Sequence, residues 1–310
     1  MTTAATEPSR RRRPTAEAER SIISTMDRRQ PGIRAVVSVI GIAVLIALAV
    51  TCAGPLLWLF KAATSTSTET LAQPFAIWPS GIHWDNIVQA FAEVDFARYL
   101  GNTLLVCLGS WFFGLLVAMT GGYGIAVLRP AYARVVSAAV LATLFIPGVI
   151  SLVALYLTVI DVPLLGINLL NTFWAVWLPA SASAFNVLLV SRFLTTIPRD
   201  LFDAARIDGA GAVRIFLEIV IPMARPIIGV LSLLTMVAAY KDFLWPLLVL
   251  NKPDLQPISV ALPRIADNTD LAVLMAAMFI SVLVLVPVLV FLVFQRQFIR
   301  AAGSAGALKE

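Results

Sequence analysis

The chain has 310 residues, of which 59% are apolar and only 13% are charged, and its mean hydropathy is +0.89. A soluble domain carries about 25% charged residues, and its core could not absorb such an apolar excess, so lipid must solvate much of the surface. The net charge of +5 does not indicate nucleic-acid binding, because the basic residues are sorted between segments rather than gathered in one patch. The composition predicts an integral membrane protein and excludes an ordinary soluble domain.

Six long apolar runs follow one another from residue 36 onward, each long enough to provide the roughly 20 residues that cross a hydrocarbon core as a helix. Five are free of charged residues, and the remaining run, the fifth in chain order, is interrupted only by Lys241 and Asp242. Helices are expected because lipid offers backbone groups no hydrogen-bonding partner. We therefore predict an all-α integral membrane fold with six transmembrane helices, over 36–60, 100–128, 135–160, 171–193, 225–250 and 271–295.

The basic residues orient these spans. Of the 23 basic residues, 18 lie in four segments, 1–35, 129–134, 192–226 and 295–310. Positively charged loops stay in the cytoplasm, so both termini are expected to be cytoplasmic. The external connections are then 61–99, 161–170 and 251–270, which hold eight of the 18 acidic residues.

In chain order, residues 1–32 form an Arg-rich cytoplasmic tail, and Arg10–Arg13 are suited to contact anionic lipid. The apolar run that follows is too long for a signal-peptide core. In the first external loop, apolar residues at helical spacing over Trp84–Ala97 predict a short helix at the membrane interface. The many glycines of the second span favour close helix packing over a substrate role.

Further along the chain, Pro147 and Pro179 interrupt the third and fourth spans, as broken helices of transport pathways do, although proline is common in membrane helices. Cys52 and Cys107 have no disulfide or metal spacing and are expected to pack as small apolar residues. The single histidine, His83, lies in an external loop. We therefore predict neither a metal site nor a catalytic triad.

The cytoplasmic loop 195–222 is too charged for lipid and too regular for a linker. Pro198 suits the first position of a helix, and Asp200 lies in its first turn, where the helix dipole favours an acid. An apolar stripe follows, Gly209 is expected to end the helix in a left-handed conformation, and a second amphipathic helix runs to Pro222. The pattern predicts a helix-turn-helix that presents an apolar face to a partner.

The sequence Asp203-Ala-Ala-Arg-Ile-Asp208-Gly209-Ala, followed by Ile219 and Pro222, resembles the coupling loop of binding-protein-dependent ABC importer permeases. That family's pattern is Glu-Ala-Ala, three residues, Gly, nine residues, Ile, two residues, Pro, and the spacing here fits throughout. The chain departs from it by an Asp in place of the first Glu. An ordinary surface helical hairpin is the alternative interpretation of the loop.

The resemblance extends to the carbohydrate-uptake class, of the maltose-system type. The segment Lys241-Asp-Phe-Leu-Trp-Pro-Leu is similar to one in the fifth span of these permeases, where an Asn usually stands in place of Lys241. Asn102-Thr103, Tyr123 and the tail from Phe294 to Lys309 are also similar. The resemblance implies the type I permease fold of ABC importers over residues 33–300, followed by a cytoplasmic tail, 301–310.

The resemblance also implies a mechanism. No Gly-x-x-x-x-Gly-Lys-[Ser/Thr] loop is present, so the chain is expected to be non-catalytic, to hold no cofactor, and to leave ATP and Mg to separate ATPase subunits. The implied partners are two ATPases, a second homologous permease, an external sugar-binding protein and the lipid of a bacterial cytoplasmic membrane, with no nucleic acid. The residues expected to contact the ATPase are Leu201, Phe202, Asp203, Ala204, Ala205, Asp208, Gly209 and Pro222.

Charged residues within a membrane span are candidates for function, so Lys241 and Asp242 are predicted on the substrate path. Tyr240, Trp245 and Asn186 are added as candidates. The alternative is that Lys241 extends to the external interface and Asp242 pairs with a neighbouring chain. It stays open which sugar is carried and whether this chain or its partner forms the main substrate site.

Two other function classes compete with sugar import. An ABC permease for a polyol phosphate, an amino acid or a peptide would share the coupling loop, and the sugar prediction depends on the segment around Asp242 and on the C-terminal tail. A secondary transporter would need an internal repeat or buried charge relays, and the sequence shows neither.

Overall fold

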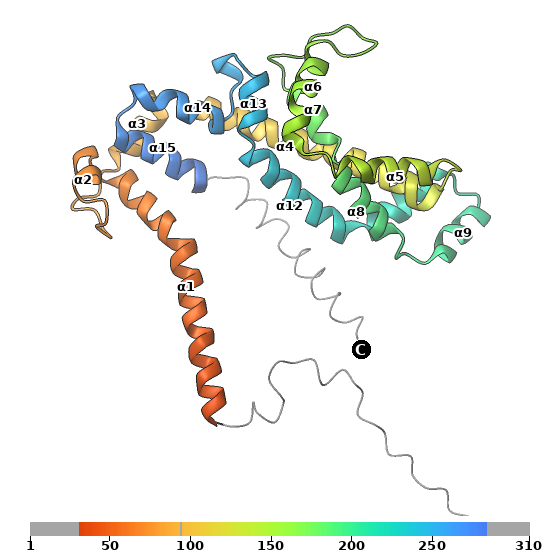
Figure 1. Ribbon diagram of the computed structural model, residues 1–310, viewed down its shortest axis with the longest axis horizontal. Helices are drawn as coiled ribbons and strands as arrows, with labels where there is room; N and C mark the ends of the chain where they lie inside the picture. Colours follow the sequence, from red (N-terminus) through yellow and green to blue (C-terminus); the bar gives the residue numbers. More distant parts are fainter. Residues whose placement is uncertain (1–30, 94, 284–310) are drawn as a thin grey trace, which may run out of the picture. The chain divides into compact units, whose positions relative to one another are not determined.

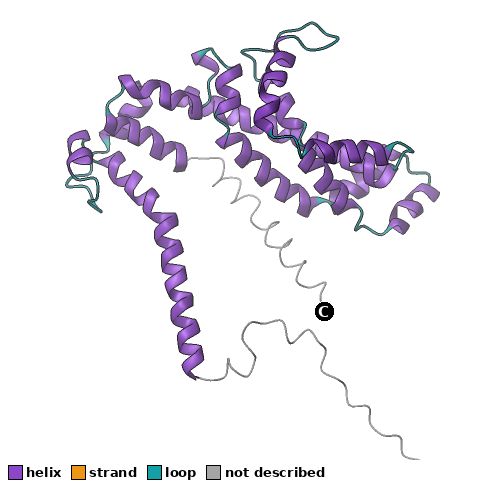
Figure 2. Cartoon of the chain, in the orientation of Figure 1, coloured by secondary structure: helices purple, strands orange, loops and turns teal. Residues whose placement is uncertain are grey.

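The computed structural model describes residues 31–93 and 95–283, and all regular structure in that part of the chain is helical (Figure 2). The chain divides into two compact units between Trp58 and Leu59. Most of the predicted N-terminal tail, the C-terminal tail 301–310 and the second half of the last predicted span lie outside the described residues.

The described part of the first unit is the greater part of α1, Pro31–Thr64. This helix is long and apolar enough over Ala35–Thr64 to cross a membrane, in agreement with the first predicted span. Pro55 lies inside it without ending it. Apolar residues occupy every face, which is typical of a helix that lipid or other helices surround.

The second unit is built along α4, Phe96–Tyr123, which continues through a π-helical turn, Gly124–Leu128. Three helices pack along α4 (Figure 1): α7, Trp174–Ser181, α8, Ala184–Leu194, and α12, Arg225–Lys241. The glycines of α4 allow this close approach. A Cβ at Gly109 would overlap the Trp177 ring, and one at Gly122 would lie 2.8 Å from Val190 Cβ. Close packing is therefore confirmed for Gly109 and Gly122, whereas a Cβ at Gly101 or Gly124 would meet no atom within 4 Å.

The third and fourth predicted spans are each two helices rather than one. α5, Ala133–Thr143, and α6, Gly148–Ile160, meet at an angle of 110°. Pro147 stands immediately before α6, where a proline lacks the amide hydrogen that a continuous helix needs. α7 and α8 are bent by 42° shortly after Pro179.

The fifth predicted span, 225–250, is also broken. α12 ends at Lys241, and α13, Leu244–Val249, begins after two non-helical residues. Before α12, the segment Ala212–Met223 is bent from it by 78° and comprises α10, Ala212–Ile215, a π turn, Phe216–Val220, and α11, Ile221–Met223. The described residues hold two helices that could cross a membrane unbroken, or up to five spans if each bent pair is one, so six spans stays a prediction.

Short helices gather at the N-terminal end of α4. They are α2, Ser67–Ala72, α3, Asp85–Glu93, α14, Ile258–Ile265, and α15, Leu271–Leu283, with 3-10 turns at Pro253–Leu255 and Ala266–Asn268. The amphipathic helix predicted over Trp84–Ala97 is α3, and it ends at Glu93. Only part of its apolar face is free to contact the membrane interface, because the rest packs inside the protein. Ala90 is buried and Ile87 packs with it against α14 and α15, whereas Val88 remains 66% exposed.

Asn102 and Thr103 attach the loop after α13 to α4. The Asn102 Nδ2 donates to the carbonyl oxygens of Asp254 and Gln256, at 2.8 and 3.0 Å. The Thr103 hydroxyl oxygen accepts from the backbone N–H of Ile258 at 2.9 Å. These residues, which form part of the family resemblance, therefore position one predicted external loop.

Candidate functional site

The predicted coupling helix is α9, Arg199–Ile207. Pro198 precedes it as the capping residue, one position earlier than predicted, and Asp200 lies in its first turn as expected. Gly209 has φ +79°, a left-handed conformation that a residue with a side chain adopts at a cost. The chain can therefore turn sharply after α9 and begin α10 at Ala212.

The structure removes Phe202 from the predicted apolar contact face of α9. Phe202 is only 4% exposed and packs in the protein's own core with Leu194 and Ile215, and Ala205 packs against the same cluster. Phe202 therefore attaches α9 to the bundle and is not accessible to another subunit, whereas Ala205 is only partly buried and its predicted contact stays a prediction. The apolar stripe in the sequence predicts that one side of α9 is covered, but it does not show whether the cover is this chain or another subunit. In the structure, this chain itself covers that side.

The other side of α9 is open. Leu201 is 44% exposed and Ile207 is 87% exposed, and between them Ala204 is exposed as well. Asp203, Asp208 and Gly209 are also exposed, as is Pro222 at the start of α11. Sequence reasoning missed Ile207, although it follows Ala204 by three residues and so lies on the same helix face.

Two connections join this loop to the end of α4. The Tyr123 hydroxyl donates to the Ala212 carbonyl at 2.9 Å, and the Tyr123 ring lies 5.2 Å from that of Phe216. Arg206 pairs with Asp203 at 2.8 Å, on the exposed surface. The Tyr123 side chain therefore links α10 and the π turn that follows it to the end of α4.

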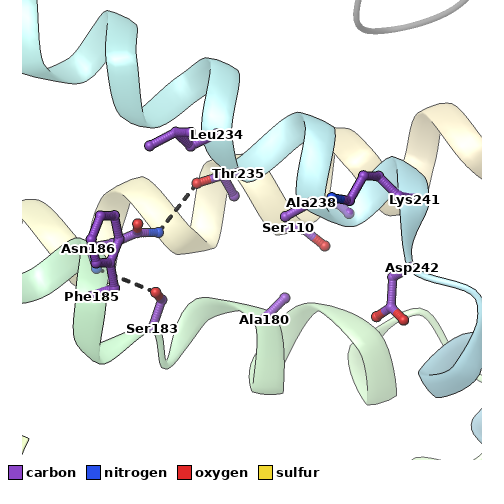
Figure 3. A pocket seen from close by; sticks show the side chains of 11 residues that line it. Ser110, Ala180, Ser183, Phe185, Asn186, Leu234, Thr235, Ala238, Lys241 and Asp242 are labelled. Carbon is purple, nitrogen blue, oxygen red and sulfur yellow. Dashed lines mark hydrogen bonds between the residues drawn. The ribbon is translucent and has the colours of Figure 1, made fainter. Parts of the chain in front are cut away.

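A cavity of about 570 Å³ lies farther along the bundle, between α4, the break that separates α7 from α8, and the end of α12 (Figure 3). Polar groups enter it from all three. The Asn186 Nδ2 donates to the Thr235 hydroxyl at 3.3 Å, and the Ser183 hydroxyl oxygen accepts from the Asn186 N–H. Ser110 is 1% exposed, and its hydroxyl has no hydrogen-bond partner among the described residues. The cavity can thus hydrogen-bond a polar solute.

Three of the five predicted substrate-path residues line this cavity: Asn186, Lys241 and Asp242. Trp245 borders an adjoining cavity of about 250 Å³, and its ring N–H donates to the Ala175 carbonyl at 2.9 Å. Tyr240 is directed elsewhere, since its hydroxyl donates to the Ser281 carbonyl at 3.4 Å. The structure therefore does not bring Tyr240 to the cavity.

Sequence reasoning missed three hydroxyl residues that line the cavity, Ser110, Ser183 and Thr235. Serine and threonine occur widely in membrane helices, where their hydroxyls usually bond the preceding turn. The sequence alone could not show that the Ser110 hydroxyl lacks such a bond.

Asp242 makes two hydrogen bonds that hold the chain between α12 and α13. Its carboxylate accepts from the Trp245 N–H in the first turn of α13 at 3.4 Å, one residue before the capping position Phe243, and Pro246 occupies the same turn, where a missing N–H costs nothing. The Asp242 backbone carbonyl accepts from the Ser259 hydroxyl at 3.1 Å. No ion pair within 4.0 Å joins it to Lys241 in the described part of the chain. Both charged groups are therefore available to the cavity.

Comparison with known proteins gives concordant results. The family described as binding-protein-dependent transport system inner membrane component matches residues 105–302. The arabinooligosaccharides transport system permease protein AraQ of Halalkalibacterium halodurans is 30% identical over 263 residues, which cover 82% of this chain and 90% of that protein. The sn-glycerol-3-phosphate transport system permease protein UgpE of Brucella melitensis is 26% identical over 280 residues, 86% of this chain and 96% of that protein.

A solved structure supports the same fold. A chain of a bacterial ABC transporter involved in the import of the acidic polysaccharide alginate superposes with a TM-score of 0.75, at 18% identity, over 87% of this chain and 98% of that chain. Together with the family match, which covers more than half of the sequence, this likeness defines the class of protein. The chain belongs to the inner membrane components of binding-protein-dependent transport systems, the permeases of ABC importers.

Proposed function

We propose that this chain is the permease subunit of an ATP-driven importer for a sugar or oligosaccharide, and that α9 is the helix by which separate ATPase subunits drive it. The observation that carries this proposal is the division of α9 into two faces. One face packs on the bundle through Phe202, and the other exposes Leu201, Ala204 and Ile207. A helix attached on one side and apolar on the other is suited to transmit a partner's motion.

The transmission would run through the end of α4. ATP binding would close the ATPase pair, which displaces α9, and Tyr123 would pass the displacement to α4 through its contacts with Ala212 and Phe216. Because α4 also borders the cavity at Ser110, the same helix can change the access to that cavity. ATP and Mg would be bound by the ATPase subunits, with no cofactor on this chain.

The cavity between α4, α8 and α12 is the proposed substrate path. An unpaired buried hydroxyl costs about 1–3 kcal/mol, so Ser110 is best satisfied when a polar solute or water reaches it. The other polar residues of the cavity supply both hydrogen-bond donors and hydrogen-bond acceptors, and the hydroxyls of a sugar need both. These residues are Asn186, Thr235, Lys241 and Asp242. The relatives named for lactose and arabinooligosaccharides transport support a carbohydrate.

The proposed assembly follows from the family. Six spans would hold both termini in the cytoplasm of a bacterial cell, with α9 at the inner surface. A second permease chain and two ATPase subunits would complete the transporter, and an external binding protein would deliver the substrate. The solved structure of a bacterial alginate ABC transporter in complex with an alginate pentasaccharide-bound periplasmic protein supports this last partner.

A polyol phosphate is the second candidate substrate. Several relatives are named for sn-glycerol-3-phosphate transport, and Lys241 would place a cation beside the cavity, where that charge would attract a phosphate. The two candidates differ in what Lys241 does. For a phosphate, Lys241→Gln should abolish uptake, whereas for a neutral sugar it should leave most uptake intact.

Uptake by a deletion strain tests the substrate path. We expect Ser110→Ala to lower uptake of the substrate, and Thr120→Val, which removes a hydroxyl from the same helix away from the cavity, to leave it unchanged. Accumulation of one labelled sugar, but not of glycerol-3-phosphate, would identify the class. Equal uptake in the Ser110 and Thr120 variants would contradict the assignment of the cavity.

A further inference from the structure

A second polar hollow, of about 700 Å³, lies between the end of α4, α5 and α8, helices that pack together at this end of the unit (Figure 1). We call it the arginine groove after Arg129, Arg134 and Arg192, which line it. The three cations come from three different elements: the residue that ends the π turn after α4, the first turn of α5 and the last turn of α8. The fold, rather than one stretch of sequence, therefore brings them together.

The charge of the groove is uncompensated within the described residues. No acidic side chain lines it, and none of its three arginines forms an ion pair there. Arg98, Arg206 and Arg214, in contrast, each pair with a carboxylate. Hydroxyl groups of Ser137, Ser191 and Thr195 add hydrogen-bonding capacity beside the arginines. Guanidinium and hydroxyl groups in this combination suit a phosphate oxygen.

The rest of the groove is apolar. Ile125, Leu141 and Leu188 contribute to its wall, with several alanines. The outer surface of α5 continues that wall, since Val135 is 71% exposed and Leu141 is 47% exposed. A soluble anion would use only the basic end, whereas a ligand with a charged head and a hydrocarbon chain would use both.

The groove also lies next to α9. It shares Ala126, Arg129 and Thr195 with a smaller cavity that Phe202, Asp203 and Arg206 of α9 complete. Its position at the cytoplasmic surface rests on the proposed function, which puts α9 there. At that depth an arginine is within reach of the headgroups of the inner leaflet.

We propose that the arginine groove binds the phosphodiester headgroup of an anionic phospholipid, with an acyl chain against the apolar wall. The arginines hold the phosphate, and the lipid lies beside the coupling helix. A binding site at this place can make the packing of α9 sensitive to the charge of the membrane, because Arg129 borders both the groove and the cavity under α9.

Native mass spectrometry of the full chain, purified in detergent with its co-purifying subunits, tests this proposal. The probes are phosphatidylglycerol, phosphatidylcholine and inorganic phosphate. The groove variant is Arg134→Gln with Arg192→Gln, and Arg129 is kept because its Nε–H donates to the Ala126 carbonyl at 2.7 Å. The matched control is Arg214→Gln with Lys252→Gln, which removes the same charge from exposed positions outside the groove.

We expect wild type and control to bind phosphatidylglycerol more tightly than phosphatidylcholine, and inorganic phosphate not to displace it. The groove variant should bind phosphatidylglycerol roughly thirtyfold more weakly, since each arginine near an anionic surface contributes about 1 kcal/mol and 1.4 kcal/mol is tenfold. Equal affinity in the two variants would overturn the proposal. Displacement by inorganic phosphate would show a soluble-anion site instead, and lipid binding only after partner subunits are removed would show a protein interface. None of these readouts depends on uptake, so a failure of the proposed function would be seen separately.

Discussion

The division of α9 into an inner and an outer face leads to a prediction for two adjacent residues. Phe202→Ala removes a ring that is 96% buried against the core cluster, whereas Leu201→Ala shortens a side chain that is 44% exposed. Truncation of a buried phenylalanine costs 3–5 kcal/mol, and we take about 3 kcal/mol here because only one face of this helix is packed. That cost should raise the population of detached α9 roughly a hundredfold.

Hydrogen exchange of the α9 amides measures this population. Amides of Arg199–Ile207 should exchange roughly a hundredfold faster in Phe202→Ala than in wild type, while Leu201→Ala should exchange at the wild-type rate. Both variants should bind the ATPase more weakly, but in Leu201→Ala α9 should stay as firmly attached as in wild type. Unchanged α9 exchange in Phe202→Ala, or equal acceleration in both variants, would refute the two-faced arrangement.

Three further predictions concern packing and the predicted external loops. Gly122→Ala places a methyl 2.8 Å from Val190 Cβ and should lower stability by about 1–3 kcal/mol in thermal unfolding, whereas Gly124→Ala meets no atom within 4 Å; equal effects would contradict the close approach. Asn102→Ala leaves two carbonyls without a donor and should speed hydrogen exchange of the Leu255 and Gln256 amides, measured against Thr120→Val; unchanged exchange would contradict the attachment of this loop to α4. The Ser67 hydroxyl, at 2.6 Å, and the Ala272 N–H donate to Asp270 and lower its pKa. The ionised carboxylate therefore stabilises the fold fully above about pH 4, and this contribution is lost as the pH falls below that value. The loss of stability caused by Asp270→Asn should shrink over the same pH range, and a loss that does not change with pH would contradict a contribution from the ionised carboxylate.

Much of the fold could be predicted from the sequence because lipid imposes a simple rule on composition. The apolar runs and the prolines indicated where helices lie and where they break, and Gly209 marked the end of α9. The bend of 110° at Pro147 could not be predicted, since a proline permits an angle but neighbouring helices set it. The break of the fifth span at Asp242 was also missed, although an acid two residues before α13 is favourable at a helix N-terminus.

The site was less predictable because it depends on distant packing. The apolar stripe of α9 was visible, but which of its residues face the bundle depends on Leu194 and Ile215, from other elements. Charged residues drew attention to Lys241 and Asp242, whereas Ser110 is notable only for the partner it lacks. Tyr240 looked suitable for a sugar by its type, but the position of α15 engages its hydroxyl at Ser281.

The central claim is that an outside ATPase drives this permease through the exposed face of α9. Ala204→Asp puts a carboxylate in the middle of that face, and Ala72→Asp makes the same change in exposed α2, away from the coupling loop. Both variants, assembled with their partners in proteoliposomes, are assayed for ATP-dependent uptake and for retained ATPase subunits. We predict that Ala204→Asp is inserted normally but loses the ATPase and its uptake, while Ala72→Asp keeps both. Wild-type uptake with the ATPase still bound to the Ala204 variant would contradict the claim.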